Sequence, residues 1–168
     1  SEYPQQRYGP GWAWDDYNDY YATEKAAFPI YGNTVKIVFE EELRKPEVYP
    51  DFFSKSITKA TDTEVNSGHA SVQRDEFKNS FTFQFPEDTL PVSRIVPFRY
   101  SQDLFVELLS DTLKKEVEIL RDHPSHLLSN SIYSIPADSL YKRMLHVSDN
   151  FIAEQLLLIC ANELSDTL

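Results

Sequence analysis

Two polar residues near the end of the chain, Ser148 and Asn150, have side chains and a spacing that are suited to catalysis. They stand one residue apart, between two runs of helical periodicity at residues 139–147 and 151–164. A serine hydroxyl held beside a lysine can relay a proton to a departing amine, and an asparagine amide can orient that lysine and bind a peptide carbonyl. A helix N-cap is the simpler alternative, because Ser, Asp and Asn satisfy the unpaired amides of a helix start. The two roles are compatible.

Two helices that meet at Ser148 would position this pair. Apolar residues on the second helix recur at helical spacing and predict one buried stripe, made of Ala153, Leu156, Leu157, Cys160 and Leu164. Cys160 is the single cysteine and cannot form an internal disulfide, so we expect a buried, inert thiol. Residues 122–136, which contain two prolines and many serines, are predicted to be a connector.

A strand-rich region is predicted upstream of these helices. Residues 35–39 and 81–85 alternate apolar and polar side chains, which is typical of half-buried strands. Residues 92–98 indicate a third strand, in which Pro97 favours a sheet edge or a strand end because proline cannot donate to the ladder. Residues 43–80 indicate short strands and loops, because their polar part, 54–74, has no sustained period. Phe52 and Phe53 within this stretch are expected to pack inward.

Helical periodicity returns after Ser101, which is predicted to cap a helix that stops before Pro124. The apolar positions of that helix are Leu104, Phe105, Leu108, Leu109, Leu113 and Val117. Residues 1–32 are aromatic and acidic, and they are too apolar for a solvated tail. They predict a loop and a short helix packed on a larger body.

Composition and charge exclude several classes of function. With 168 residues and 41% apolar content, the chain can bury a real core and is not expected to be disordered. Sixteen Lys and Arg against 27 Asp and Glu give a net charge of −11, so no nucleic-acid partner is expected. No apolar run approaches the roughly 20 residues of a transmembrane segment, and the N-terminus shows no signal peptide. His123 and His126 flank a proline without a completing Cys or acid pair, so neither a metal site nor a cofactor is predicted.

Two blocks of sequence carry a family resemblance. Residues 144–157 read Met-Leu-His-Val-Ser-Asp-Asn-Phe-Ile-Ala-Glu-Gln-Leu-Leu. This segment resembles the Met-x-x-x-Ser-Asp-Asn-x-x-Ala-Glu-x-Leu signature of the D-alanyl-D-alanine carboxypeptidase/endopeptidase family, the class C low-molecular-mass penicillin-binding proteins of peptidase family S13. Residues 11–17 read Gly-Trp-Ala-Trp-Asp-Asp-Tyr and are similar to that family's Gly-Trp-x-Trp-Asp/Asn-Asp block. The two blocks occur in the family's order.

The resemblance implies a periplasmic serine-type D-Ala-D-Ala carboxypeptidase that acts on peptidoglycan stem peptides through an acyl-enzyme and is acylated by β-lactam antibiotics. It also implies an α+β fold. Residues 1–128 would belong to inserted β-containing domains, with a packed helix, between the first and second catalytic motifs. Residues 129–168 would be the helical part of a penicillin-binding/β-lactamase-like catalytic domain, with Ser148 and Asn150 as its catalytic residues.

The Trp-x-Trp block would contribute to substrate binding in such an enzyme. Asp16 and Tyr21 would face the substrate's diamino-acid side chain, because a carboxylate suits an ammonium group and an aromatic face adds cation–π attraction. A turn-capping acid is the alternative for Asp16. The same acidic, aromatic surface around Trp12 and Trp14 leaves open a function of another class, a non-catalytic module that binds peptidoglycan or cationic peptides.

The sequence departs from the family pattern at two motifs. Ser-x-x-Lys, which supplies the nucleophile and its base, belongs upstream of the Trp-x-Trp block, where this sequence has none. Residues 56–59 fit the bare pattern, but they follow the block and lack the apolar stripe of a helix that places Ser and Lys on one face. Lys-Thr-Gly should follow Ser148 by about a hundred residues, and the sequence ends at Leu168.

These departures predict the middle part of a longer enzyme, which is inactive alone because it lacks the nucleophile. A class A β-lactamase is a weaker alternative, since that family places its first motif only about sixty residues before Ser-Asp-Asn. Ser56 precedes Ser148 by a much longer stretch.

Overall fold

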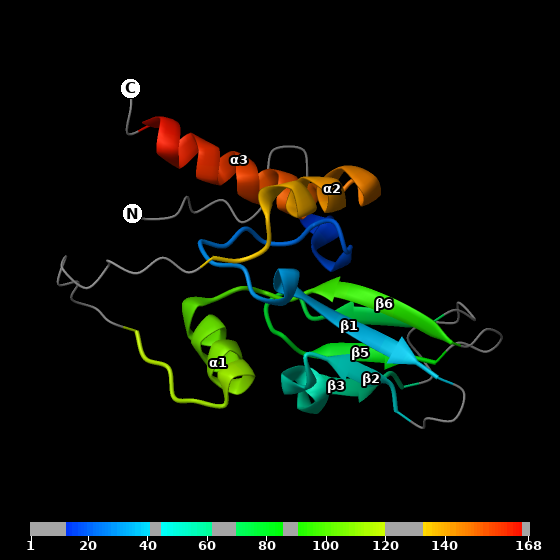
Figure 1. Cartoon of the computed structure of the whole chain (residues 1–168). Helices are drawn as coiled ribbons and strands as arrows, with labels where there is room; N and C mark the ends of the chain where they lie inside the picture. The colour runs from blue at the N-terminus through cyan, green and yellow to red at the C-terminus, as the bar shows by residue number, and fades with distance from the viewer. Residues whose placement is uncertain (1–12, 41–44, 62–69, 86–90, 120–132, 166–168) are drawn as a thin grey trace. The chain divides into compact units, whose positions relative to one another are not determined.

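The structure is a computed structural model that describes residues 13–40, 45–61, 70–85, 91–119 and 133–165. The chain divides into two compact units, Ser1–Ser101 and Gln102–Leu168. Among the described residues, the first unit holds two small sheets and three 3-10 helices, and the second holds three α-helices (Figure 1). The α+β class is therefore confirmed.

The first sheet has the strand order β2-β1-β6, and both of its pairs are antiparallel. Its strands are β1 (Thr34–Phe39), β2 (Glu47–Tyr49) and β6 (Val92–Pro97). The alternation predicted for β1 is confirmed, because Val35, Ile37 and Phe39 are fully buried. Pro97 is the last residue of β6, which is an edge strand, so it has both of the positions that proline favours.

The second sheet has the strand order β3-β5-β4. Its strands are β3 (Ile57–Lys59), β4 (Ser71–Arg74) and β5 (Phe81–Gln84). β3 and β4 come from residues 43–80, where short strands were predicted, and β5 corresponds to the strand predicted at residues 81–85. β3 runs parallel to β5, and β4 runs antiparallel to it. Phe81 and Phe83 of β5 are buried, as their alternation with Thr82 and Gln84 predicts.

Phenylalanine rings join the two sheets into one core. The ring centroid of Phe39 on β1 lies 6.0 Å from that of Phe83 on β5. Phe53, in the 3-10 helix η3 (Asp51–Ser56), lies 5.8 Å from Phe81 and 5.4 Å from Phe98, measured between centroids. Phe53 is thus packed inward as predicted. Edge-to-face and tilted contacts of this kind add to the stabilisation that comes from burying the rings.

The helix α1 (Gln102–Leu113) begins directly after Ser101, as predicted, but it ends well before Pro124. Lys114 adopts a left-handed backbone with φ 52°, and the N–H of Lys115 donates to the oxygen of Ser110 at 3.2 Å. A left-handed residue terminates a helix, so Val117 lies outside α1 and the predicted length was wrong. Residues 120–132, which hold most of the predicted connector, lie outside the described ranges.

The helices α2 (Ala137–Val147) and α3 (Asn150–Ser165) meet at Ser148, which confirms the predicted helix pair. The predicted buried stripe on α3 is wrong. Leu157 and Leu164 are 69% and 62% exposed, and Cys160 is exposed as well. Periodicity identifies residues that share a helix face, but it cannot say whether another element covers that face. Within the described ranges, no helix has both the length and the apolar character that a membrane span requires.

Candidate active site

Ser148 lies at the junction of α2 and α3 in a left-handed backbone conformation, with φ 51° and ψ 51°. Its N–H donates to the backbone oxygen of Met144, and the N–H of Asp149 donates to the same oxygen at 3.0 Å. Glycine is the usual residue at such a helix end, because a Cβ disfavours the left-handed conformation by roughly 1 kcal/mol. Helix termination alone therefore favours no side chain at this position, and yet the sequence has a serine there.

Asp149 is the residue that caps α3. Its Oδ1 accepts a hydrogen bond from the N–H of Ile152 at 3.1 Å, and its backbone oxygen accepts one from Ala153 at 3.1 Å. The capping alternative for the Ser-Asp-Asn segment thus applies to Asp149. Ser148 and Asn150 are exposed, and neither side chain has a hydrogen-bond partner among the described residues. Both polar groups remain available to a ligand or to another catalytic group.

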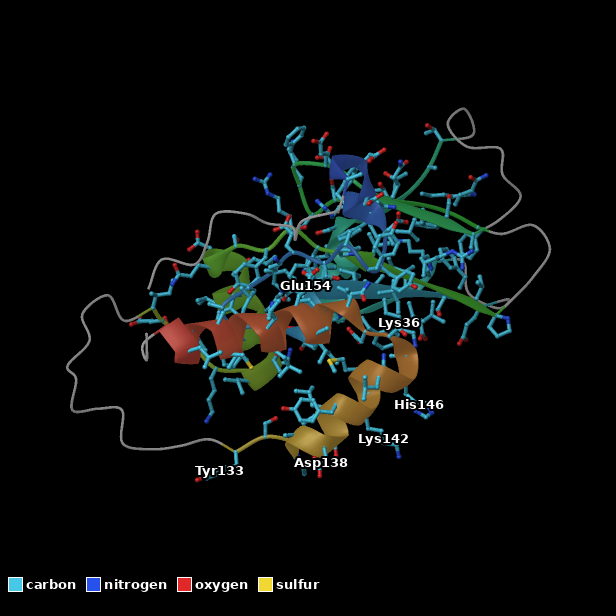
Figure 2. The ribbon with its side chains drawn as sticks, turned by 90° about the horizontal axis from the view of Figure 1, so that it is seen from above. Lys36, Tyr133, Asp138, Lys142, His146 and Glu154 are labelled. Atoms are coloured by element: carbon cyan, nitrogen blue, oxygen red, sulfur yellow. The ribbon has the colours of Figure 1, made fainter. Side chains whose placement is uncertain are left out.

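Arg143, in the last turns of α2, connects that helix to the capping residue. Its Nε lies 3.8 Å from Oδ2 of Asp149, and the Asp149 side chain is only 24% exposed. An ion pair with one partner in solvent contributes about 0–1 kcal/mol. Three other polar residues of α2, Asp138, Lys142 and His146, project from the side of the helix that faces away from α3 (Figure 2).

Asp16 lies in the 3-10 helix η1 (Trp14–Asn18) of the first unit. Its Oδ2 accepts a hydrogen bond from the N–H of Ala13 at 3.1 Å, while its own N–H donates to the oxygen of Ala13 at 3.2 Å. The turn-capping role weighed for Asp16 is therefore present. A carboxylate offers about four acceptor positions, so capping leaves Asp16 able to bind a cation as well.

Tyr21 lies close enough to Asp16 for the charge of that carboxylate to affect the pKa of Tyr21. The Tyr21 hydroxyl donates to Oδ2 of Asp19 at 2.9 Å, and its ring packs edge-on against Tyr20 with centroids 5.5 Å apart. The hydrogen bond to Asp19 is the largest cause that raises the pKa of Tyr21 above 10.0, followed by desolvation and by the charges of Asp19 and Asp16. We call Asp16, Asp19, Tyr20 and Tyr21 the acidic–aromatic cluster. Its negative field favours a cationic ligand.

Two residues that sequence reasoning missed hold η1 in place. Asn18 donates from Nδ2 to the oxygen of Val72 at 3.0 Å and accepts from the N–H of Arg74 at 2.8 Å. The Arg74 guanidinium, only 2% exposed, donates to the oxygens of Pro97 at 2.9 Å and Tyr17 at 3.2 Å. Its carbon lies 5.1 Å from the centroid of the Tyr17 ring. The available signal was that Arg74 occupies the buried register of β4, two residues after Val72.

Ser56 and Lys59 do not form a nucleophile and base pair. Ser56 ends η3, and the three residues that follow it form the extended strand β3. Over three extended residues the chain advances about 10 Å, so Ser56 and Lys59 are not one helical turn apart on a common face. This geometry agrees with the rejection of Ser56 as a nucleophile, since an acylating serine and its lysine share one helical face.

Three residues considered in the sequence lie outside the described ranges, namely Trp12, His123 and His126. Within the described part of the chain, no group of three or more His, Cys, Asp or Glu side chains is arranged to hold a metal ion. The structure brings Asp16 and Tyr21 together in the first unit, and it places Ser148 and Asn150 at one helix junction in the second.

A model of the D-Ala-D-Ala carboxypeptidase 3 (S13) family matches residues 1–167. The match includes both the Trp-x-Trp block and the Ser-Asp-Asn segment, and it confirms the resemblance seen in the sequence. No curated protein matches the chain.

Proposed function

The chain belongs to the D-Ala-D-Ala carboxypeptidase 3 (S13) family, and we propose that it is part of a serine enzyme that cleaves the D-Ala-D-Ala bond of peptidoglycan stem peptides. The α2–α3 junction is the observation that carries the proposal. There, the helix cap is made by Asp149, while Ser148 occupies a position that favours glycine, and its hydroxyl has no hydrogen-bond partner within the described part of the chain. A side chain at such a position is better explained by chemistry than by stability.

In the proposed acylation step, the hydroxyl of a nucleophilic serine transfers its proton to a neighbouring lysine and attacks the carbonyl carbon of the penultimate D-Ala. The bond between that carbon and the nitrogen of the terminal D-Ala then breaks. Ser148 accepts a proton from the lysine ammonium and passes its own proton to the departing nitrogen, so that D-Ala leaves as a neutral amine. Water subsequently hydrolyses the ester that links the substrate to the enzyme.

Asn150 has two roles in this proposal. Its amide oxygen accepts a hydrogen bond from the lysine and orients it, and its amide N–H₂ donates to a peptide carbonyl of the substrate. Asn150 is the first residue of α3, directly after the capping Asp149, so its backbone is held by the start of the helix. The serine and lysine themselves come from a Ser-x-x-Lys motif of the whole enzyme. We therefore propose that these 168 residues are inactive alone.

The acidic–aromatic cluster suggests how the substrate is selected. Stem peptides carry a diamino acid whose side chain ends in an ammonium group, and Asp16 with the Tyr21 ring offers a carboxylate and an aromatic face for it. The proposal also includes acylation of the parent protein by β-lactam antibiotics, a periplasmic location, and a catalytic domain that begins near residue 129 after the inserted domains.

Acylation of the full-length protein by a fluorescent penicillin tests the proposal. Ser148→Ala should slow acylation by about a hundredfold or more, because proton transfer by a positioned group contributes 10²–10⁴-fold. Ser139→Ala is the matched control, since Ser139 is exposed in the first turn of α2 and should leave the rate unchanged. A Ser148→Ala protein that acylates at the normal rate would remove Ser148 from the mechanism.

A non-catalytic binding module remains the second candidate, and the acidic–aromatic cluster is the observation that favours it. Such a module would bind stem peptides with equal affinity in the parent protein and in its Ser148→Ala and Asn150→Ala variants. The parent protein would also show no acylation by penicillin. Titration calorimetry with a stem peptide, run beside the penicillin assay, separates the two functions.

A further inference from the structure

We propose that Asp149 is a positioning residue for the site and that the capping of α3 by its carboxylate sets the geometry of Ser148 and Asn150. The inference rests on the proposed function. Asp149 would not touch the reacting atoms. It acts through the two neighbours that flank it in the sequence.

The first observation is that Asp149 joins the two helices through separate atoms. Its N–H donates to Met144 on α2, and its Oδ1 accepts from Ile152 on α3 at 3.1 Å. Its Oδ2 lies 3.8 Å from the Nε of Arg143, again on α2. The residue between Ser148 and Asn150 is thus fixed to the end of one helix and to the start of the next.

The second observation is the backbone of Ser148. A residue with a Cβ does not favour the left-handed conformation, so contacts around Ser148 must stabilise it. On the α2 side, the Met144 oxygen accepts hydrogen bonds from the N–H groups of both Ser148 and Asp149. On the α3 side, the capping bond of Asp149 holds the start of the helix. Without the cap, the first turn of α3 can fray and the hydroxyl can move relative to the Asn150 amide.

The two contacts of the Asp149 carboxylate differ in strength, so the variants that remove them should differ in their effect on acylation. The bond to the Ile152 amide is a partly buried hydrogen bond of ordinary length. The contact with Arg143 is longer, and the Arg143 side chain is 65% exposed. Asparagine keeps an acceptor for the Ile152 amide while it loses the charge that attracts Arg143. Capping, not charge, is therefore the property that the proposal assigns to Asp149.

The test compares Asp149→Ala, Asp149→Asn and Arg143→Gln in the full-length protein, with Asp138→Ala as the matched control. Asp138 is an acid in the first turn of α2 and projects away from α3 (Figure 2). The measurement is penicillin acylation, resolved into the first-order acylation constant and the dissociation constant of the non-covalent complex. It is made at a temperature at which circular dichroism shows every variant to be folded.

We expect Asp149→Ala to lower the acylation constant by about tenfold or more with little change in the dissociation constant, because small misplacements of reacting groups cost that much. Asp149→Asn should restore the constant to within about threefold of the parent, and Arg143→Gln should stay in the same range. A general loss of stability would change the dissociation constant as well as the acylation constant. An effect on the acylation constant alone, which Asp149→Asn restores, therefore separates positioning from folding.

Two results would overturn the proposal. One is an Asp149→Ala protein that acylates like the Asp138→Ala control. The other is an Asp149→Asn protein as slow as Asp149→Ala, which would assign the effect to charge. Ser148→Ala, measured in the same series, keeps the two proposals apart. If it acylates normally, the proposed function fails. If it is slow while Asp149→Ala is normal, only the positioning role fails.

Discussion

Two residues with a left-handed backbone, Asn33 in the first unit and Ser148 in the second, are held in opposite ways. Asn33 is fully buried. Its Nδ2 donates to the oxygen of Glu24 at 3.0 Å, and its Oδ1 accepts from the N–H of Ile30 at 3.1 Å. The Ser148 side chain is exposed and has no such partner among the described residues. The unusual backbone serves the packing of the first unit, whereas in the second it presents a free hydroxyl.

A similar contrast is seen between other residues of the two units. In the first unit even charged groups are buried and bonded: Arg74 binds four backbone oxygens, and Oε2 of Glu24 accepts from the N–H of Tyr100 at 3.1 Å. In the second unit large apolar side chains are exposed, among them Leu145 at 75% and Leu157 at 69%. The first unit thus derives its order from a closed core, while the helix junction of the second derives its order from local bonds at helix ends.

The largest expected effect on stability comes from the aromatic core. Phe53→Ala should lower the free energy of unfolding of the full-length protein by about 3–5 kcal/mol, because it removes ring contacts to Phe81 and Phe98 and leaves a cavity. Leu157→Ala is the matched truncation in the second unit and should change the free energy of unfolding by at most about 0.5 kcal/mol. Denaturant titration measures both. Equal losses would show that the contrast between the two units is wrong.

The buried guanidinium should have the next largest effect. Arg74→Met keeps most of the volume but leaves the oxygens of Pro97 and Tyr17 without their donor, so we expect a loss of about 3 kcal/mol in the free energy of unfolding. Arg143→Met, at an exposed arginine, should cost about 0.5 kcal/mol or less. Denaturation followed by tryptophan fluorescence compares the two variants. A small effect at Arg74 would mean that η1 is not anchored through this side chain.

Glycine substitutions at the two left-handed residues should change stability in opposite directions. Asn33→Gly relieves the backbone but removes one buried and one partly buried hydrogen bond, so the free energy of unfolding should fall by about 1–2 kcal/mol. Ser148→Gly removes a hydroxyl that has no partner among the described residues, and glycine adopts the left-handed backbone without strain. The free energy of unfolding should therefore rise by about 0.5–1 kcal/mol. In the penicillin assay Ser148→Gly should nevertheless be slow. A glycine variant that is both more stable and fully active would contradict the role proposed for Ser148.

The smallest expected effect is on the titration of the acidic–aromatic cluster. Folding raises the pKa of Tyr21 above 10.0, chiefly through its hydrogen bond to Asp19. The stability contributed by that bond is therefore fully present below pH 10 and is lost as the pH rises through the raised pKa. Asp19→Asn should return the pKa of Tyr21 toward its ordinary value, as followed by NMR of ¹³C-labelled tyrosine. Asp51→Asn, at an exposed acid of η3, should not shift it.

The sequence predicted most of the elements because their periodicity is local. Alternation placed β1, β5 and β6, and helical spacing placed α2 and α3 around Ser148. The end of α1 was missed, because lysine is not a residue that predicts a left-handed backbone at a helix end, and Lys114 adopts one. The candidate site residues were found from two motifs. Asn18 and Arg74, which hold the η1 segment that carries Asp16, were not found, since the residues they bond lie far away in the sequence.

By itself, the sequence determined the family, the α+β class, and the placement of a serine and an asparagine at a helix junction. Motif order and the spacing of apolar residues are properties of neighbouring positions, and they are readable without a fold. Only the tertiary structure decided that Asp149 makes the cap, that Arg74 is buried and that Cys160 is exposed. Each of these depends on which atoms meet at a helix end or cover a surface, and no period in the sequence encodes that.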